Sequence, residues 1–417
     1  MDMGISRKSM IVAMAACGLF TGVGLSADPA SSWPQFRGPT GTGQAADKAV
    51  PTKWDAGSVV WKTPLKGKGH SSPVVAGDKI FLTSALEDGR QRVVLAFDLA
   101  SGKQLWEQVA WTGNPEKSHK MNGWATPTVY ADGQHVWAWF GPAGVYCYTE
   151  GGKPVWSQQL GKFDTKNARG ISSSLLVVDD ILVVNGDSES DPYLFGLDKA
   201  TGKTVWKTER PAAEGYSSPF LLEAHGKKQI ILNGDKFVAG YDPKTGKEFW
   251  HCKSFAGRGE PVPAVGADGT IFVVNGLAGD VYAVRTDGAG DVTKTHMTWH
   301  TRRNEGRDQP SPLVIGNHVL VSNMKGILSC YDAKTGKELW KERIATGDIT
   351  AAPLAAGGKG YFNFENGETV VIEPGEKLKI VATNKLVPQG GEVFRASLAP
   401  ADGKLLIRSD QTLYCIK

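Results

Sequence analysis

Residues 241–250 read YDPKTGKEFW, and this phrase decides the fold because variants of it recur along the chain. Three near-copies share its Asp, its Gly-Lys pair and its final Trp: FDLASGKQLW (97–106), LDKATGKTVW (197–206) and YDAKTGKELW (331–340). Self-similarity at a long period is the signature of repeat architectures. The phrase therefore predicts a protein built from repeated units rather than from unrelated domains.

The Trp that ends each phrase sets the period of the repeat. Trp is a large apolar side chain, so we assign this column a structural role in filling the space between neighbouring units. One more unit fits near Ile380, where the Trp is lost. The column has seven members, spaced by 41 to 50 residues: Trp61, Trp106, Trp156, Trp206, Trp250, Trp299 and Trp340.

A second column lies two residues before the Asp of each phrase and holds a small side chain. We interpret this column as a device for close packing of one sheet on another. Three of the four Cys that follow the leader occupy it in different units, so we expect free, buried thiols rather than disulfides. The eight members are Ala96, Cys147, Gly196, Gly240, Ala283, Cys330, Val371 and Cys415.

Each unit contains four short β-rich runs bounded by Gly, Asp or Asn. In 71–107 these are SSPVVAG, KIFLTS, VVLAFD and QLWE. Four antiparallel strands repeated every 40 to 50 residues are typical of a β-propeller blade. The last unit (395–417) supplies only three strands, and SVVWKTPL (58–65) is a Trp-bearing strand with no unit before it. We therefore predict an all-β, eight-bladed propeller over 58–417, closed by its N-terminal strand.

The phrase itself reads as a turn between the third and fourth strands. Asp caps such a turn through its side chain, and Gly supplies the positive φ that the turn needs. As catalytic acids or metal ligands these Asp residues would be spread around a ring, which argues for the structural role.

The segment before the propeller has the parts of a secretory signal. Arg7 and Lys8 precede an apolar stretch, and small residues end it at Ala27. We predict a signal peptide over 1–27, an irregular arm over 28–57, and a location in the periplasm or cell envelope. Lipid attachment at Cys17 is the alternative. No later stretch is long and apolar enough to cross a membrane, and a net charge of +4 without a basic run gives no reason to expect nucleic acid.

The phrases resemble the quinoprotein, or PQQ-like, repeat of the form A-x-D-x-x-T-G-K-x-x-W, over nearly all of the chain after the leader. The arm sequence WPQFRGPTGTG (33–43) also looks like the arm of a subset of exported proteins of this type. The resemblance implies an eight-bladed propeller. The family contains both PQQ-dependent alcohol dehydrogenases and non-enzymatic, BamB-like envelope proteins, so the resemblance alone leaves the function open.

The cofactor machinery of the family's enzymes is missing from the sequence. Those enzymes use two adjacent Cys and a Ca²⁺ held by acidic and amide side chains, and this chain has no Cys-Cys pair and no C-x-x-C-H haem motif. We therefore expect neither PQQ nor Ca²⁺ as a cofactor.

Two other stretches resemble metal sites. HMTWH (296–300) spaces two His four apart, but on an expected strand, where the two side chains lie about 13 Å apart. The loop DSESDP offers Asp187, Glu189 and Asp191 for a Ca²⁺ ion, although it lacks EF-hand spacing and we favour a solvated loop.

The loops that lead into the inner strands share one face of the propeller, opposite the Asp-Gly turns. We take this channel mouth as the candidate site, either for an anionic or sugar-like ligand or for a protein partner. The alternative is that its charged residues only pair with one another around a wet pore. The candidates are His70, Asn122, Trp124, Arg169, Tyr216, Arg258, Glu260, Arg307, Asp308 and Arg395, with Asp348 nearby.

Together these patterns favour an exported, monomeric, non-catalytic scaffold that binds an envelope protein or a small ligand. The alternative is an enzyme, either a quinoprotein oxidoreductase or a carbohydrate-active enzyme, that uses the channel mouth.

The leader gives a direct prediction. The mature protein should begin at Asp28 without lipid, because the small residues before it suit signal peptidase. Intact-mass measurement of protein purified from an exporting bacterial host checks this. A mass that matches an acylated Cys17 would contradict it.

Overall fold

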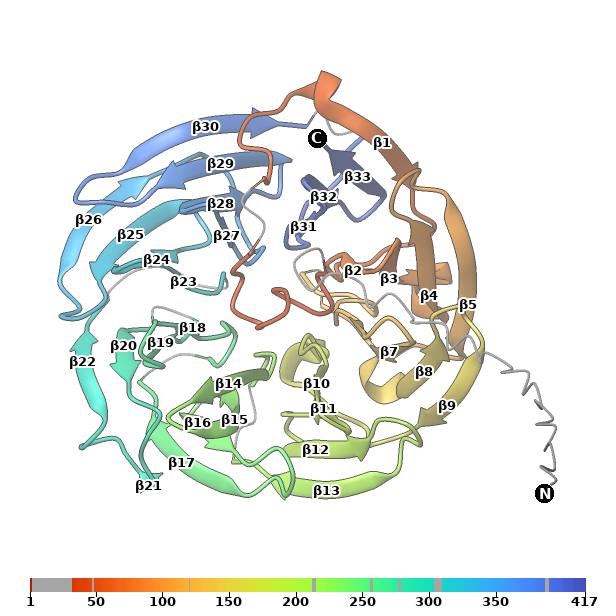
Figure 1. Ribbon diagram of the computed structural model, residues 1–417, viewed down its shortest axis with the longest axis horizontal. Helices are drawn as coiled ribbons and strands as arrows, with labels where there is room; N and C mark the ends of the chain where they lie inside the picture. Colours follow the sequence, from red (N-terminus) through yellow and green to blue (C-terminus); the bar gives the residue numbers. More distant parts are fainter. Residues whose placement is uncertain are drawn as a thin grey trace.

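The structure is a computed structural model in which eight sheets, seven of four strands and one of five, form a closed ring around a central channel (Figure 1). The predicted leader, the lipid-attachment candidate Cys17 and the channel-mouth candidates Arg307 and Asp308 lie outside the described residues. The structure describes Met1 and residues 32–417, apart from 47–48, 120, 212–214, 256–257, 277–278, 304–309 and 387–389.

Each sheet is one blade, and its strands run from the channel outward. Blades 1 to 4 are β2 (Val74–Ala76), β3 (Lys79–Leu86), β4 (Gln91–Asp98), β5 (Gln104–Thr112); β6 (Tyr130–Ala131), β7 (His135–Trp139), β8 (Val145–Thr149), β9 (Pro154–Gln158); β10 (Leu176–Val178), β11 (Ile181–Asn185), β12 (Tyr193–Asp198), β13 (Thr204–Glu209); and β14 (Phe220–Ala224), β15 (Lys227–Asn233), β16 (Phe237–Tyr241), β17 (Glu248–Lys253).

The remaining blades complete the ring and confirm the predicted number. Blades 5 to 8 are β18 (Ala264–Val265), β19 (Ile271–Val274), β20 (Val281–Val284), β22 (Met297–Thr301); β23 (Leu313–Ile315), β24 (His318–Ser322), β25 (Ile327–Asp332), β26 (Glu338–Arg343); β27 (Leu354–Ala356), β28 (Lys359–Asn363), β29 (Glu368–Glu373), β30 (Lys379–Lys385); and β31 (Ala399–Ala401), β32 (Lys404–Arg408), β33 (Thr412–Ile416), β1 (Val59–Pro64). Among the described residues, four short 3-10 helices lie outside the strands: Ala56–Ser58, Glu87–Gly89, Gly141–Ala143 and Lys166–Ala168.

The ring closes through β1, as predicted. This strand pairs antiparallel with β33 and places Trp61 opposite Cys415. Residues near the two ends of the chain therefore share the eighth blade, which leaves no gap between it and the first. Closure removes the two open sheet faces that a linear array of blades would expose to water.

The Asp-Gly turn has the predicted geometry. In blade 3 the Asp198 carboxylate accepts a hydrogen bond from the Thr201 backbone N–H at 2.8 Å, and Gly202 has a φ of +74°. The other phrases repeat this arrangement, with Asp98 accepting from the Ser101 N–H and Asp332 from the Thr335 N–H. The Asp side chain thus fixes the turn that returns the chain into the outer strand.

The Trp of one blade docks on the turn of the next. The Trp206 indole of blade 3 covers Gly246 of blade 4 and donates its Nε1–H to the Pro243 carbonyl at 3.0 Å. The same bond joins Trp61 to Leu99, Trp106 to Glu150, Trp156 to Lys199, Trp299 to Ala333 and Trp340 to Gly375, at 2.9 to 3.2 Å. The Trp column therefore links neighbouring blades, as expected.

The small-residue column has a different purpose from the one the sequence suggested. Its members lie opposite the Trp of their own blade, as Gly196 does with Trp206 and Cys330 with Trp340. A Cβ on Gly196 would clash with the Trp206 indole. The column is small because the indole folds back over its own sheet before it reaches the next blade.

Two junctions depart from the pattern. Trp250 donates to the Gln229 side chain at 2.7 Å, and that amide in turn donates to the Thr286 carbonyl of blade 5 at 3.0 Å. In the longer loop of blade 5, β21 (Gly290–Asp291) pairs in parallel with β17. Blade 7 has no Trp. Trp54, from the segment before β1, donates its backbone N–H to the Asn384 side chain of blade 7 and belongs to a core cluster shared by blades 7, 8 and 1.

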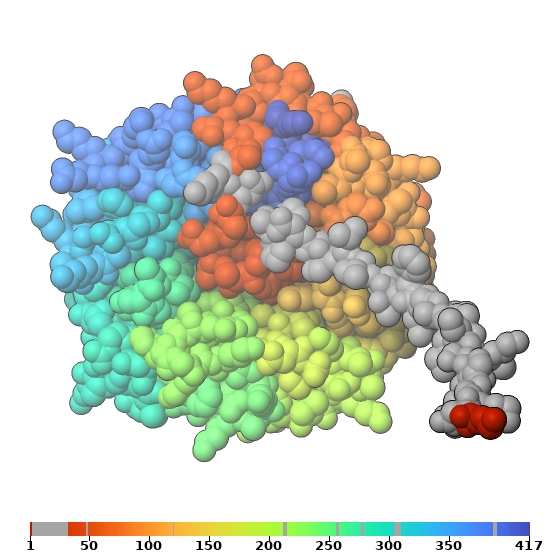
Figure 2. Space-filling model, viewed as in Figure 1, coloured from red at the N-terminus to blue at the C-terminus, as the bar shows by residue number. Residues whose placement is uncertain are grey.

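The N-terminal arm crosses the centre of the ring (Figure 1), and Figure 2 shows its residues filling that centre on the face in view. Trp33 exchanges two backbone hydrogen bonds with Val75 of blade 1, and residues 43 and 45 bond Ala355 of blade 7. Arg37 is 2% exposed and donates to the carbonyls of Val262 and Pro312, in the segments that enter blades 5 and 6. The arm is thus an ordered part of the channel.

Docking of the indole gives a matched pair of variants. Gly246→Ala adds a Cβ that displaces the Trp206 ring, whereas Gly226→Ala has a similar φ, +71° against +69°, and nothing within 4 Å. Gly226→Ala should cost only the backbone strain, about 1–2 kcal/mol. Gly246→Ala should cost about 3–5 kcal/mol, the range for losing a buried aromatic contact. Urea denaturation of both variants measures the difference, and equal losses would show that the docked ring contributes little.

Candidate functional site

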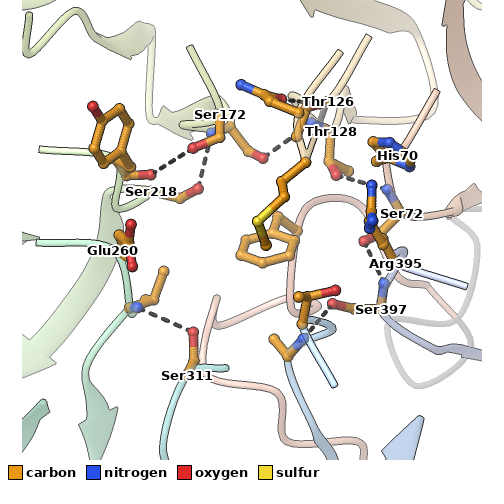
Figure 3. Close-up of a pocket in the computed structure, with 18 of the residues that line it drawn as sticks. His70, Ser72, Thr126, Thr128, Ser172, Ser218, Glu260, Ser311, Arg395 and Ser397 are labelled. Atoms are coloured by element: carbon orange, nitrogen blue, oxygen red, sulfur yellow. Dashed lines mark hydrogen bonds between the residues drawn. The ribbon is translucent and has the colours of Figure 1, made fainter. Parts of the chain in front are cut away.

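A cavity of about 240 Å³ opens within the channel (Figure 3). Its walls come from the segments that precede the inner strands of all eight blades, and Phe36 of the arm also lines it. No residue of the Asp-Gly turns of the four phrases lines it. The cavity therefore lies among the loops that were predicted to form the channel mouth.

Six of the predicted site residues come together around this cavity: His70, Asn122, Arg169, Tyr216, Glu260 and Arg395. They reach it from blades 1, 2, 3, 4, 5 and 8, which are far apart in sequence. Trp124, Arg258 and Asp348 do not line it.

The three excluded residues have structural contacts. Trp124 packs on Gly89 and donates its indole N–H to the Glu116 carbonyl at 2.8 Å. Arg258 lies 3.8 Å from Glu260, so it neighbours the cavity through that carboxylate. Asp348 pairs with the ammonium of the exposed Lys325.

A ring of hydroxyl groups surrounds the cavity, and sequence reasoning missed it. In each link a backbone N–H at the start of one blade donates to the Ser or Thr side chain at the matching position of the next, at 2.8 to 3.0 Å. The six hydroxyls belong to Ser72, Thr128, Ser174, Ser218, Ser311 and Ser397.

The ring is interrupted where Val262 and Ala352 occupy the equivalent position without a hydroxyl. The sequence signal was available, because these eight positions follow the same repeat period as the Trp column. Small hydroxyl residues are common at strand ends, so the presence of Ser or Thr at these positions did not by itself predict a ring.

His70 stands in this wall with an electrically neutral imidazole. Burial, together with the positive charges of Arg395 and Arg408, lowers its pKa to about 3. Its backbone N–H donates to the Ala125 carbonyl, while its buried Nδ1 has no hydrogen-bond partner among the described residues. The ring therefore offers the cavity polarity without charge.

Arg395 is held in place by a two-point contact with Glu365. The two Arg–carboxylate bonds measure 3.0 and 3.3 Å, and Thr350 donates to the same carboxylate at 2.9 Å. Parallel bonds of this kind fix the plane of a guanidinium. Arg395 thus lines the cavity in a fixed orientation.

Two further guanidinium groups lie buried beside the cavity. Arg37 follows Phe36 and donates to three backbone carbonyls, while Arg408 is fully buried and donates to the Ser71 and Thr83 carbonyls and to the Ser71 hydroxyl. Burial lowers the pKa of each to about 9, so both remain cationic at neutral pH. Neither makes a salt bridge with a carboxylate of the described residues.

The acidic loop that suggested a Ca²⁺ site is used for structure. Asp187 is fully buried and binds Arg210 at 2.9 Å. Burial favours a higher pKa for Asp191, but hydrogen bonds from the Phe163 and Lys162 backbone N–H groups hold it below its usual value. Glu189 is exposed. Within the described part of the chain, no three His, Cys, Asp or Glu side chains are placed to hold a metal ion.

The cysteines lie away from the cavity. All four in the described residues are buried and free, as expected. Burial raises the pKa of Cys147, Cys252 and Cys330 to about 12 and that of Cys415 to about 11, so none is a thiolate at neutral pH.

Comparison with known proteins places this chain in a family. The family model described as outer membrane protein assembly factor BamB matches residues 41–134, 90–342 and 279–411. A curated BamB from Legionella pneumophila (strain Paris) is 25% identical over 200 residues, which cover 47% of this chain and 49% of that protein. A lanthanide-dependent methanol dehydrogenase from Methylorubrum extorquens is 23% identical over 398 residues, which cover 73% and 65%. The chain thus spans about half to two thirds of the length of these relatives.

Solved structures agree on the fold. BamB from Moraxella catarrhalis superposes with a TM-score of 0.62 at 14% identity, covering 86% of this chain and 96% of that one. A europium-containing methanol dehydrogenase gives 0.54 at 12% identity, covering 94% and 98%. Helices long and apolar enough to span a membrane are absent from the described residues. Because the family model matches most of the chain, the protein belongs to the PQQ-like propeller family described by the outer membrane protein assembly factor BamB.

Proposed function

We propose that the protein is an exported, non-catalytic scaffold of the cell envelope that binds a small ligand in the channel cavity. The observation that carries this proposal is the cavity itself, where an arm of the chain and all eight blades enclose a small polar space. Loops on a rigid scaffold are the usual place for binding groups. A protein partner would then contact the surrounding loops.

The lining favours binding over acid–base catalysis. General acid–base catalysis works best with a group whose pKa lies near the working pH. His70, with a pKa of about 3, is far from that range, and the Nδ1 of His119, the other lining histidine, already accepts the Met121 backbone N–H at 3.3 Å. Glu260 is the single carboxylate among the described lining residues, so the paired carboxylates typical of glycoside hydrolysis are missing from them.

The same residues do not match the donor set of a PQQ enzyme. The described lining includes no cysteine, and one carboxylate is too few for a Ca²⁺ site with oxygen ligands. Phe36 and the arm also occupy space near the axis. These observations support the proposal of a propeller that works without the quinone.

Reconstitution tests the proposal against the enzyme alternative. The full chain, mixed with PQQ and either Ca²⁺ or a lanthanide ion and then desalted, should retain no quinone absorbance. It should oxidise methanol and ethanol with an artificial dye no faster than a protein-free blank. A quinoprotein alcohol dehydrogenase treated in the same way serves as the positive control. Stoichiometric quinone with turnover would overturn the scaffold function.

The neutral state of His70 gives a second test. In ¹³C-histidine-labelled protein, its imidazole signals should keep their neutral positions from about pH 7.5 to about pH 4.5, because its pKa lies well below the ordinary 6.5. Below about pH 6.5 the His70 imidazole binds a proton in the unfolded chain but not in the folded chain. His70 therefore lowers the free energy of unfolding as the pH decreases through that range.

The signal is assigned by its loss in His70→Gln, and free imidazole in the sample reports the ordinary titration. A titration midpoint of His70 near neutral pH would contradict the buried, neutral assignment.

A further inference from the structure

The hydroxyl ring is an array of hydrogen-bond donors. Each of its six oxygens already accepts a backbone N–H from the preceding blade. A hydroxyl that accepts one bond retains its own hydrogen for donation. Each of these side chains is at most 6% exposed, and none donates to another described residue. The hydrogens of six buried hydroxyls are therefore available to an occupant of the cavity that carries several acceptor oxygens.

Positive charge surrounds the same space. Arg169 and Arg395 line the cavity, and Arg37 and Arg408 lie buried behind it with only neutral hydrogen-bond acceptors. Glu365 pairs with Arg395, whereas Arg37 and Arg408 have no carboxylate of the described residues within salt-bridge distance. Buried charges are ordinarily paired, because an uncompensated one is costly away from water. An anion in the cavity would supply the missing counter-charge.

One feature of the wall requires more than a simple anion. The carboxylate of Glu260 lines the cavity and is an acceptor, as Figure 3 shows beside the hydroxyls. A carboxylate repels an anion unless the ligand presents hydroxyl groups to it. The unpartnered Nδ1 of His70 is a further polar atom that can hydrogen-bond a ligand hydroxyl. The occupant should therefore carry both an anionic end and hydroxyl groups.

The volume of the cavity limits the class of ligand that it can hold. The cavity holds about 240 Å³, below the roughly 300–1,000 Å³ of pockets for drug-sized ligands. A monosaccharide fits this scale, whereas an oligosaccharide or a nucleotide does not. On the basis of the proposed function, we propose that the cavity binds a sugar acid of monosaccharide size, whose carboxylate faces the arginines and hydroxyl ring and whose hydroxyls face Glu260.

Calorimetric titration of the full chain tests the class with three probes. D-Glucuronate carries the carboxylate and the hydroxyls, D-glucose lacks the carboxylate, and inorganic phosphate lacks the carbon-bound hydroxyls. We expect D-glucuronate to bind at least about tenfold more tightly than either of the others, since one charge-assisted hydrogen bond is worth a factor of that order.

Ser218→Ala tests the ring directly. It should weaken D-glucuronate binding about five- to tenfold, while Ser101→Ala in the exposed turn should leave it unchanged. Ser218→Ala is expected to fold, because Val262 and Ala352 already occupy ring positions without a hydroxyl. A melting curve close to that of the unmodified chain confirms this.

The contrary outcomes are separate from those of the scaffold function. Equal binding of D-glucose, or tighter binding of phosphate, overturns the sugar-acid class and leaves a ligand-binding scaffold. If Ser218→Ala binds D-glucuronate with the same affinity as the unmodified chain, the assigned site is wrong. If none of the three probes binds, the inference is wrong, and the quinone reconstitution still decides independently between scaffold and enzyme.

Discussion

The structure depends on one repeated contact, an indole laid across the glycine turn of the next blade. Three sequence features meet in it: the Trp, the Gly beneath its far side, and the small residue beneath its near side in its own blade. The indole N–H and a turn carbonyl add a directional bond to the packing. Because six of the eight junctions use this contact, most blades are positioned by their neighbours in the same way, and the ring of blades acquires a regular angle.

The fold was predictable because each part of this contact is a local rule repeated many times. Asp198 and Gly202 show the predicted turn, and β1 closes the ring on β33. The purpose of the small column was misread, since Gly196 accommodates its own Trp206 and not a facing sheet. The pairing register of the third and fourth strands decides which side chain lies over the small residue, and the spacing of residues along one strand does not reveal that register.

The site was predictable in part for the same reason. Large or charged residues near the inner strands stand out, so His70, Arg169 and Arg395 were found. Trp124 does not line the cavity, because a loop aromatic is as readily a packing residue, here against Gly89. The hydroxyl ring was missed because its links join blades that the sequence keeps about 45 to 55 residues apart, and no single serine marks them. The path of the arm through the channel left no periodic signal at all.

Closure through β1 also has a kinetic consequence. Trp61 and Cys415 are paired, so the eighth blade combines the first strand of the chain with its last three. Until the two strands pair, the first and seventh blades lack the eighth blade that covers their shared core cluster in the closed ring. The last step of assembly is therefore a contact of very long sequence separation, and the unclosed chain must be kept from aggregating until it forms.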